Sequence, residues 1–366
     1  MSTDSRATQK TADVWSIYEP DVAKDFFGFP PLRPYLVATA FGAESAARHG
    51  ANPRWAEDIV TELYLRDRDV TSVLSLCCGF GTIEQHMVRC LGSVDTCLAV
   101  DIAPGAVKEA ARRAAGRDLG AVIRYDVADL NSYDWPGPTY DLVIATGALH
   151  HLARIEDVLD GVMGCLKPGG VLFANEHIGA RYQDFPPRQL EMINAAAHLV
   201  PPALRRRRSL RANPFTGSFL ERPVDALLGN LDLSGDQSQR SPGKRALASV
   251  LRRVTLPPSR GFGPLVRSPK QRILRSDPSE GVSSDRILHA VRRRFGDVHV
   301  HPYGGALLAY ALDSAFYAGF KAEDPRHRLL LQALCSLESL LVQSGELPDE
   351  HAIIVAVKGE AETASC

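Results

Sequence analysis

The sequence of 366 residues contains no long apolar run. A transmembrane helix needs roughly 18 or more consecutive apolar residues, and no stretch of the chain approaches that length. The first residues, Met1–Lys10, are polar and lack the apolar centre of a secretory signal. We therefore expect a cytoplasmic protein that does not insert into a membrane.

The cysteine spacings typical of disulfide scaffolds and zinc sites are absent as well. The seven cysteines form no C-x-x-C pair and no regular framework. The adjacent Cys77 and Cys78 stand on one turn, where they cannot easily share a tetrahedral metal ion. Because disulfide scaffolds and zinc sites are recognised by regular cysteine spacing, the sequence favours neither. We predict no metal site.

The net charge of −1 hides an uneven distribution. Residues 180–294 contain 22 Lys and Arg against 9 Asp and Glu, a net of +13, so the remaining residues carry −14. A basic segment beside an acidic body indicates either an anionic ligand or a segment docked on its own protein. The run Arg205–Arg208 lies in this segment, and the sequence alone assigns it no role.

The chain is longer than the ~250–300 residues at which one hydrophobic core stops growing. With 45% hydrophobic and 23% charged residues, its composition is that of an ordinary globular protein. We predict an N-terminal helical segment over 1–70, with a frayed tail at 1–15. An α/β domain follows over 71–179 and 295–358, interrupted by a basic, mainly helical insertion at 180–294.

Short apolar runs alternate with helical stretches from residue 72 onward. Strands this apolar, separated by helices, are typical of a parallel sheet covered on both faces. Two further apolar runs near the C-terminus bring the expected total to seven. The fold class is therefore α/β, with a doubly wound, Rossmann-like sheet. The expected strands are Ser72–Leu76, Thr96–Val100, Val122–Tyr125, Tyr140–Ile144, Val171–Asn175, Asp297–His301 and Ala352–Val357.

A small-residue turn follows the first strand. It reads Cys77-Cys78-Gly79-Phe80-Gly81, and Asp101 ends the next strand 22 positions after Gly79. A carboxylate at that spacing can accept hydrogen bonds from two ribose hydroxyls. The turn is not G-x-G-x-x-G, which a pyrophosphate requires. A sulfonium cofactor has no phosphate and needs only a tight turn, so the pattern favours such a cofactor over a dinucleotide.

The sequence resembles the class I S-adenosylmethionine-dependent methyltransferases over Ser72–Asn175 and Asp297–Val357. The markers are V-L-S-L-C-C-G-F-G, A-V-D-I, D-V-A-D-L-N, Y-D-L-V-I-A-T-G-A-L-H-H-L and L-K-P-G-G-V-L-F. The resemblance implies that S-adenosylmethionine is bound with its methionine part on the turn, its ribose on Asp101 and its adenine on Asp129, for which Asp126 is the main competitor. The full cofactor set is Ser75, Cys77, Cys78, Gly79, Gly81, Asp101, Ile102, Asp129, Leu130 and Thr146.

Two positions depart from the pattern of that family. Its turns usually have glycine where Cys77 stands and often an acidic residue where Ser75 stands. Several flanking motifs look like those of a bacterial subgroup that acts on glycans or secondary metabolites. They are F-P-P-L-R-P-Y at 29–35, N-E-H-I-G at 175–179, D-P-S-E at 277–280, P-Y-G-G at 302–305 and L-P-D-E-H-A-I-I at 347–354.

Candidate catalytic residues follow strands four and five, where α/β sheets bind their ligands. His150, His151 and Glu176 are the candidate bases toward a substrate hydroxyl. The structural alternatives are helix capping for the histidine pair and a plain hydrogen bond for Glu176. Three further residues are candidates for binding the acceptor, namely His177, Tyr182 and Tyr303. The segment 180–294 would form the acceptor side of the site.

We therefore expect a methyltransferase that transfers a methyl group to an oxygen atom of a small-molecule acceptor, either a sugar or a secondary metabolite. The sequence leaves open whether the acceptor is anionic and whether the protein forms a homodimer. One alternative is a nucleic-acid-directed methyltransferase that uses the basic segment. Against it, the segment after strand four is T-G-A-L-H-H rather than the Asp/Asn-Pro-Pro-aromatic turn of base-amino methyltransferases, and the basic segment lacks interleaved aromatic residues. A second alternative is a catalytically silent, cofactor-binding auxiliary protein.

Overall fold

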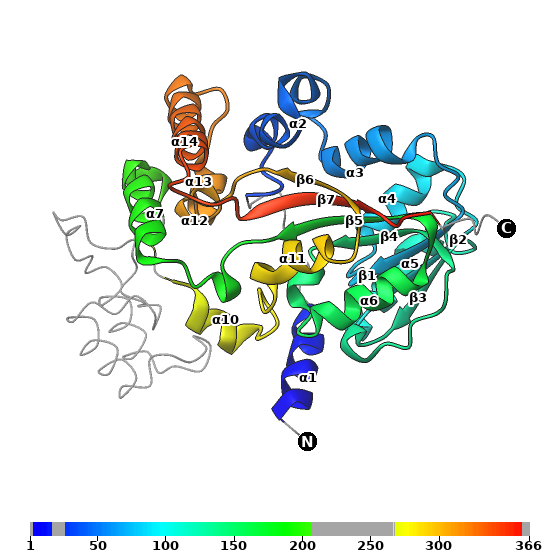
Figure 1. Ribbon diagram of the computed structural model, residues 1–366. Coiled ribbons are helices and arrows are strands. Elements are labelled where there is room, and N and C mark those ends of the chain that lie inside the picture. Colours follow the sequence, from blue (N-terminus) through cyan, green and yellow to red (C-terminus); the bar gives the residue numbers. More distant parts are fainter. Residues whose placement is uncertain (1–2, 17–25, 206–265, 267, 361–366) are drawn as a thin grey trace, which may run out of the picture.

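The computed structural model describes residues 3–16, 26–205, 266 and 268–360. In this part, a seven-stranded sheet forms the centre and helices cover both of its faces (Figure 1). The strands are β1 Ser72–Leu76, β2 Thr96–Asp101, β3 Ile123–Val127, β4 Tyr140–Thr146, β5 Leu166–His177, β6 Asp297–Pro302 and β7 His351–Val357. The helices are α1 Thr3–Trp15, α2 Arg33–His49, α3 Trp55–Val60, α4 Thr82–Leu91, α5 Pro104–Ala115, α6 Ile155–Cys165, α7 Pro187–Leu199, α10 Lys270–Ser276, α11 Ile287–Arg292, α12 Leu308–Ala311, α13 Ser314–Gly319 and α14 Pro325–Gln343.

The strand order is β3-β2-β1-β4-β5-β7-β6. Strands β1 to β5 pair in parallel, whereas β7 runs antiparallel between β5 and β6. The order reverses at β1, which places a crevice at the carboxyl ends of β1 and β4, the usual ligand site of such sheets. The expected Rossmann-like, seven-stranded fold is confirmed.

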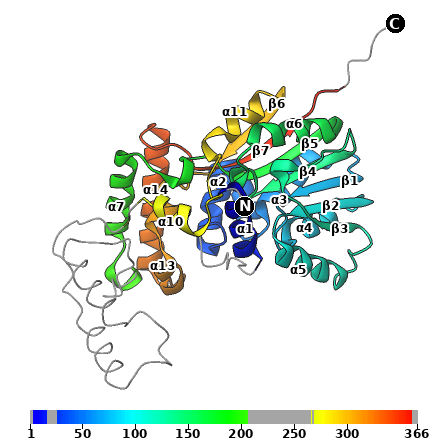
Figure 2. The ribbon, with the colours of Figure 1, turned by 90° about the horizontal axis from the view of Figure 1, so that it is seen from below.

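The sheet separates two hydrophobic cores, because side chains alternate along each strand. Val73, Leu142 and Phe173 belong to one core, with residues of α3 and α4. Their neighbours Leu74 and Val143 belong to the other, with residues of α6 and α11. Figure 1 shows the two helical layers. The first core continues past β6 and β7 into α2, α7, α13 and α14, so the fold has a helical extension beyond that end of the sheet (Figure 2).

The N-terminal residues differ from the expectation of a frayed tail, because Thr3–Trp15 forms helix α1. This helix is stabilised by tertiary contacts rather than by its own helix propensity. The Oγ1 of Thr11 and the Nε1 of Trp15 donate to the carboxylate of Asp277, at 3.1 and 2.7 Å. At its end, the Oγ of Ser16 accepts a hydrogen bond from the backbone N of Gly105, at 3.2 Å. Helix α1 therefore links the start of α5 to the segment around Asp277.

The basic segment 180–294 contains helices α7, α10 and α11 in its described part. Most of its arginine-rich stretch, including Arg206–Arg208, lies outside the described residues. Its last helix, α11, packs against α6 on one face of the sheet rather than standing apart from it. The proposed domain boundaries stay a prediction. Among the described residues, no helix combines the length and apolarity needed to span a membrane.

Candidate active site

Strand register brings the candidate residues to one edge of the sheet. Thr146 at the end of β4 pairs with Asn175 of β5, and His177 at the end of β5 pairs with His351 at the start of β7. On the other side of β1, Asp101 ends β2. The carboxyl ends of parallel strands meet at the same edge. The predicted cofactor and acceptor residues therefore form one continuous rim.

The turn after β1 depends on its glycines. Gly79 has φ +52° with open space where a side chain would stand, and Gly81 has φ +77°. A Cβ on Gly81 would lie 2.6–2.8 Å from Gln85, Tyr125 and Ala110, so this position has no room for a side chain. Gly79 leaves room for a ligand, and Gly81 lets α4 approach the sheet.

Cys77 adopts the left-handed conformation that the family usually reserves for glycine, with φ +48°. The turn forms with a side chain at this position, and Cys77 is one of the residues that line a small pocket next to the turn. Burial raises the pKa of the Cys77 thiol, with Asp101 adding to the shift. A thiol held protonated is a weak nucleophile, so Cys77 lines the site rather than reacting.

Asp101 holds the turn in place through its carboxylate. One oxygen accepts from the backbone N of Gly79 and the other from the backbone N of Ala103, both at 2.8 Å. Burial raises the pKa of Asp101, and these hydrogen bonds oppose that shift. A carboxylate has about four lone-pair sites, so two remain for ribose hydroxyls. The cofactor role predicted for Asp101 fits its position.

Asp129 caps the short 3-10 helix Leu130–Ser132. Its Oδ1 accepts from the backbone N and the side-chain Nδ2 of Asn131, at 2.9 and 3.0 Å, which leaves Oδ2 available. Its competitor Asp126 instead pairs with Arg124 at 2.7 Å, with about half of its side chain exposed. This geometry favours Asp129 for the adenine amine. Leu130 is buried in the core beside β1 and β2, and Ile102 is half-buried.

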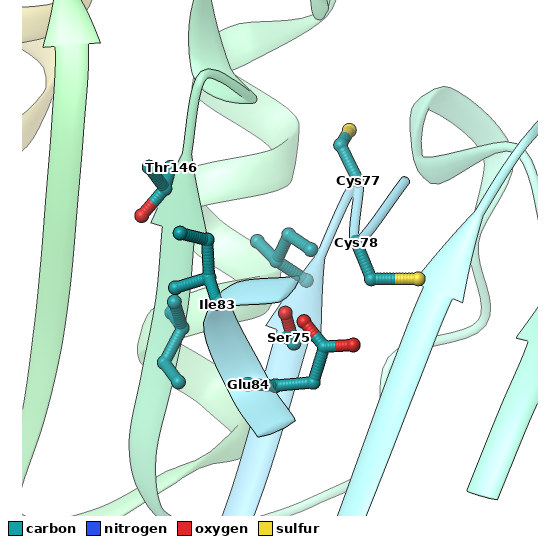
Figure 3. Close-up of a pocket in the computed structure, with 8 residues that line it drawn as sticks. Ser75, Cys77, Cys78, Ile83, Glu84 and Thr146 are labelled. Carbon is teal, nitrogen blue, oxygen red and sulfur yellow. The ribbon is translucent and has the colours of Figure 1, made fainter. Parts of the chain in front are cut away.

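A pocket behind the glycine turn contains a residue that the sequence analysis missed. Figure 3 shows the carboxylate of Glu84, from α4, beside the hydroxyl of Ser75. Glu84 is 0% exposed; Oε1 accepts from the hydroxyl of Tyr125 at 2.8 Å. Its Oε2 and the Oγ1 of Thr146 have no hydrogen-bond partner among the described residues. The cavity of about 20 Å³ admits one water-sized group, which suits the ammonium of a methionine part.

The contacts of Glu176 favour the structural alternative, a plain hydrogen-bonding role, over the role of a base. Glu176 is 1% exposed, and its Oε1 accepts from the backbone N of Ala148 and of Leu149, both at 2.8 Å. Its Oε2 accepts from the backbone N of His150 and lies 2.6 Å from Nδ1 of the same residue. Four donors therefore surround the carboxylate. Glu176 is placed to orient the turn Leu149–His151 rather than to reach a substrate.

His150 and His151 lie side by side, with ring centroids 4.2 Å apart. Their Nε2 atoms both face Oε2 of Glu280, at 3.8 and 3.6 Å. On the far side, Nδ1 of His151 lies 2.9 Å from Oγ of Ser279, which donates to Asp277 at 2.6 Å. The D-P-S-E motif that supplies these three residues was noted in the sequence, but nothing there assigned it to the histidines.

Burial and charge act against each other in this cluster. Burial lowers the pKa of His150, but Glu176 and Glu280 outweigh it and raise the pKa to about 9. For His151, burial and the neighbouring charge of His150 together lower the pKa. Burial raises the pKa of Glu280, yet the surrounding histidines outweigh it and leave that pKa below its usual value. The protonation states of His150, His151 and Glu280 therefore depend on one another.

His177 and Tyr303 form the wall beyond this cluster. Nε2 of His177 lies 3.0 Å from Oε2 of Glu350, a carboxylate that also accepts from Gln189 at 2.7 Å. Tyr303 is 2% exposed, stacks on His351 and donates to Oδ1 of Asn175 at 2.7 Å. Tyr303 therefore supports the wall from behind.

Tyr182 is held beside Gly281, the residue that follows Glu280. Its backbone N donates to the backbone O of Gly281 at 2.9 Å, and its own φ is +55°. The side chain is half-buried, with the guanidinium of Arg181 over its ring. Of the three predicted acceptor residues, His177 lies beside His150, with ring centroids 6.1 Å apart. Tyr182 instead contacts Gly281, next to Glu280, and Tyr303 lies behind His351.

Comparison with known families agrees with this geometry. Residues 74–172 match the family described as a methyltransferase domain. An uncharacterized methyltransferase of Mycobacterium bovis is 35% identical over 100 residues, which are 27% of this chain and 47% of that protein. A ubiquinone/menaquinone biosynthesis C-methyltransferase of Azotobacter vinelandii is 28% identical over 104 residues, which are 28% of this chain and 41% of that protein.

The match spans about half the length of these curated relatives. Among solved structures, the [4+2]-cyclase SpnF aligns over 91% of this chain and 94% of its own, with 14% identity and a TM-score of 0.41. An S-adenosylmethionine-dependent methyltransferase of Mesorhizobium loti aligns over 36% and 57%, with 24% identity and a TM-score of 0.30. The match over residues 74–172 agrees with the methyltransferase domain expected from the sequence.

Proposed function

We propose that this protein transfers the methyl group of S-adenosylmethionine to a hydroxyl of a small-molecule acceptor, a sugar or a secondary metabolite. The observation that carries the proposal is the single rim that joins Asp101, the glycine turn and the histidine pair. The flanking motifs that resemble a bacterial glycan and secondary-metabolite subgroup support the choice of acceptor class.

The residues at the cofactor end fit the parts of S-adenosylmethionine. Asp101 has two free lone-pair sites for the ribose, and Asp129 has a free oxygen for the adenine amine. Oε2 of Glu84, which has no hydrogen-bond partner among the described residues, would receive the methionine ammonium in the pocket behind the turn. When bound, the cofactor supplies a methyl group already activated on sulfur.

The residues at the acceptor end would hold the hydroxyl that receives this methyl group. The Nε2 atoms of His150 and His151 face the cluster, whereas their Nδ1 atoms are engaged by Glu176 and Ser279. Burial and the charge of His150 lower the pKa of His151, so Nε2 of His151 is the atom to which an acceptor hydroxyl can donate its hydrogen bond and pass its proton. Holding donor and acceptor at a fixed separation supplies much of the rate of a displacement reaction, and hydrogen bonding to the hydroxyl supplies the rest.

The cluster is partly covered by an element far away in the sequence. The ring of Trp15 in α1 meets the ring of His151 edge-on, with centroids 5.6 Å apart. Helix α1 also reaches Gly105, just after the strand that ends at Asp101. It therefore spans both ends of the proposed site, as expected for a cover that excludes solvent from a transfer reaction.

The test is a transfer assay with S-adenosylmethionine labelled on its methyl group. The purified protein is incubated with panels of glycosides and polyphenolic or polyketide alcohols, and with RNA and DNA as separate arms. Label in a small molecule supports the proposal. Label in nucleic acid would replace it with the nucleic-acid hypothesis. Cofactor binding by calorimetry without transfer to any arm would favour an auxiliary, cofactor-binding protein.

A further inference from the structure

Three ligand-type atoms converge on one point at the acceptor end. Nε2 of His150 and Nε2 of His151 lie 3.8 and 3.6 Å from Oε2 of Glu280, and all three atoms lie within 4.8 Å of one another. These separations are longer than an N–H···O hydrogen bond of about 2.7–3.2 Å. Ligands that share one metal ion at about 2.0–2.2 Å lie roughly 3–3.5 Å apart. The gap is therefore close to that around a metal ion.

The proton on His151 can be placed from its neighbours. An ionised Asp277 can only accept, so Ser279 gives its one hydroxyl proton to Oδ1 of Asp277, 2.6 Å away. The Oγ of Ser279 must then accept from His151, whose Nδ1 lies 2.9 Å from it. The proton of His151 is thus on Nδ1. Its Nε2 presents a lone pair toward Glu280.

His150 is arranged in the same way. Its Nδ1 lies 2.6 Å from Oε2 of Glu176, a carboxylate that already accepts from three backbone N–H groups. Nδ1 must therefore be the donor, and a ring without a proton on Nε2 presents its lone pair there. Two imidazole nitrogens and a carboxylate oxygen then face the same point, as the ligands of one cation would.

The outer contacts are those of a metal-binding site. Histidines that bind metals almost always donate their other ring N–H to a carboxylate, a carbonyl or a similar acceptor, which fixes the tautomer and the ring orientation. Here Glu176 does this for His150, and Ser279 with Asp277 does it for His151. The side chains of His151 and Glu280 keep 14% and 26% of their surface exposed, which provides a path for entry.

We propose that His150, His151 and Glu280 bind one divalent transition-metal ion of the zinc or iron(II) class, with an open coordination position at the acceptor end. Two imidazoles and one carboxylate suit these ions, whereas Mg²⁺ and Ca²⁺ prefer sites made of oxygen. Sites with three protein ligands keep a position for water or substrate. The ion would take the Nε2 atoms of His150 and His151 that the proposed function assigns to the acceptor hydroxyl, so with the ion bound the acceptor would use the open position. The test below measures ion binding itself and does not require transfer activity.

A second group of ligand-type residues, Asp58, His86 and Cys90, provides the matched control. Nε2 of His86 already lies 2.5 Å from Oδ1 of Asp58, and Cys90 is exposed. This group is therefore a local hydrogen-bonded cluster on the surface. It also contains a thiol, which the proposed site lacks, so the two clusters differ in the spectra of bound metal.

The experiment titrates the metal-free, full-length protein with Zn²⁺ by calorimetry and with Co²⁺ by visible absorption. One ion per chain is expected, and Co²⁺ should show d–d bands without a thiolate charge-transfer band. Glu280→Gln should weaken Zn²⁺ binding by ~100-fold or more, and Ser279→Ala by the ~10–100-fold typical of an outer contact. His86→Ala should leave the affinity unchanged. Circular dichroism checks that each variant is folded.

Three results would overturn the proposal. The wild-type protein could bind neither ion, in which case the cluster holds a proton instead. The Co²⁺ spectrum could contain a thiolate band, or His86→Ala could abolish binding, and either would place the ion at Cys90. Folded Glu280→Gln protein could bind as the wild type does. The wild-type spectrum decides the matter even if a variant fails to fold.

Discussion

Ser75 and Glu84 face the same small pocket from different elements, Ser75 from strand β1 and Glu84 from helix α4. The family that the sequence resembles often has an acidic residue where Ser75 stands. Here a hydroxyl takes that place, and the carboxylate comes from the helix beyond the turn. The carboxylate is fully buried and has one oxygen without a partner among the described residues, so it is poised to receive a positively charged group.

Glu84 should make the stability of the ligand-free protein fall as the pH rises. Burial raises its pKa from 4.5 to about 7, with the Tyr125 hydroxyl opposing the shift. The unfolded chain ionises first, so stability present below the unfolded pKa is lost between about pH 4.5 and 7, by roughly 3 kcal/mol. Urea unfolding of wild type and Glu84→Gln across this range measures the difference. Glu84→Gln should lack this loss, and equal pH profiles would contradict the assignment.

Glu84 should also couple cofactor binding to proton release. If the methionine ammonium enters its pocket, the carboxylate must ionise, so affinity for S-adenosylmethionine should rise as the pH passes about 7. Calorimetry in buffers of different ionisation enthalpy counts the released proton. Glu84→Gln should bind more weakly and release none. Proton release that persists in this variant would point to another group.

Asp101→Ala should weaken the binding of S-adenosylmethionine. Hydrogen bonds to a charged group contribute about 1.5–3 kcal/mol each, so the loss of one ribose contact alone should lower affinity by roughly tenfold or more. Asp126→Ala is the matched control, because that carboxylate pairs with Arg124 at the surface. Calorimetry gives both affinities. Unchanged binding in Asp101→Ala, or a loss in Asp126→Ala, would refute the assignment.

Cys77→Gly should stabilise the protein. A side chain in the left-handed region costs about 1–2 kcal/mol, and the greater freedom of glycine in the unfolded chain offsets about 0.4–1 kcal/mol of that gain. A net increase of roughly 0.5–1 kcal/mol in the free energy of unfolding is expected. Cys77→Ala removes the thiol and keeps the strain, so it should gain nothing of this kind. A Gly variant no more stable than the Ala variant would show that the turn is unstrained.

His150 and His151 should govern turnover rather than cofactor binding. Replacing the one that contacts the acceptor hydroxyl with Ala should lower kcat by roughly 10²–10⁴, while calorimetry shows unchanged affinity for S-adenosylmethionine. Glu176→Gln should act through His150, which it orients at 2.6 Å, and should give a smaller fall in kcat. If all three variants retain wild-type kcat on the true acceptor, positioning alone would carry the reaction.

Sequence patterns predicted which residues lie at the rim of the sheet, but they did not predict which segments pack over that rim. Strand and turn signals are local, so the sequence alone places Asp101, Gly79, His150 and Glu176 at one edge. Ser279 and His151 are 128 positions apart, and nothing in the spacing of either motif brings them together. Glu84 was missed because the resemblance directed attention to the strand position, not to the helix behind it.

For helix α1 the sequence predicted a frayed tail where the structure has a helix. Its sequence is polar and offers no hydrophobic face of its own, so local propensity favoured a frayed tail. The helix instead gains its contacts from Asp277, to which Thr11 and Trp15 donate. Tertiary contacts commonly outweigh intrinsic helix propensity. A partner 266 positions away could not be predicted from residues 3–15 themselves.

The place of β7 between β5 and β6 has a consequence for how the protein is made. Residues 351–357 leave the ribosome after the other strands of the sheet, yet they pair with both neighbours and supply His351 to the site. Until they emerge, β5 has an open edge that can pair with another nascent chain, and β6 has no neighbour. The acceptor wall is therefore the last part to assemble, and a chain interrupted before His351 would be both inactive and prone to aggregate.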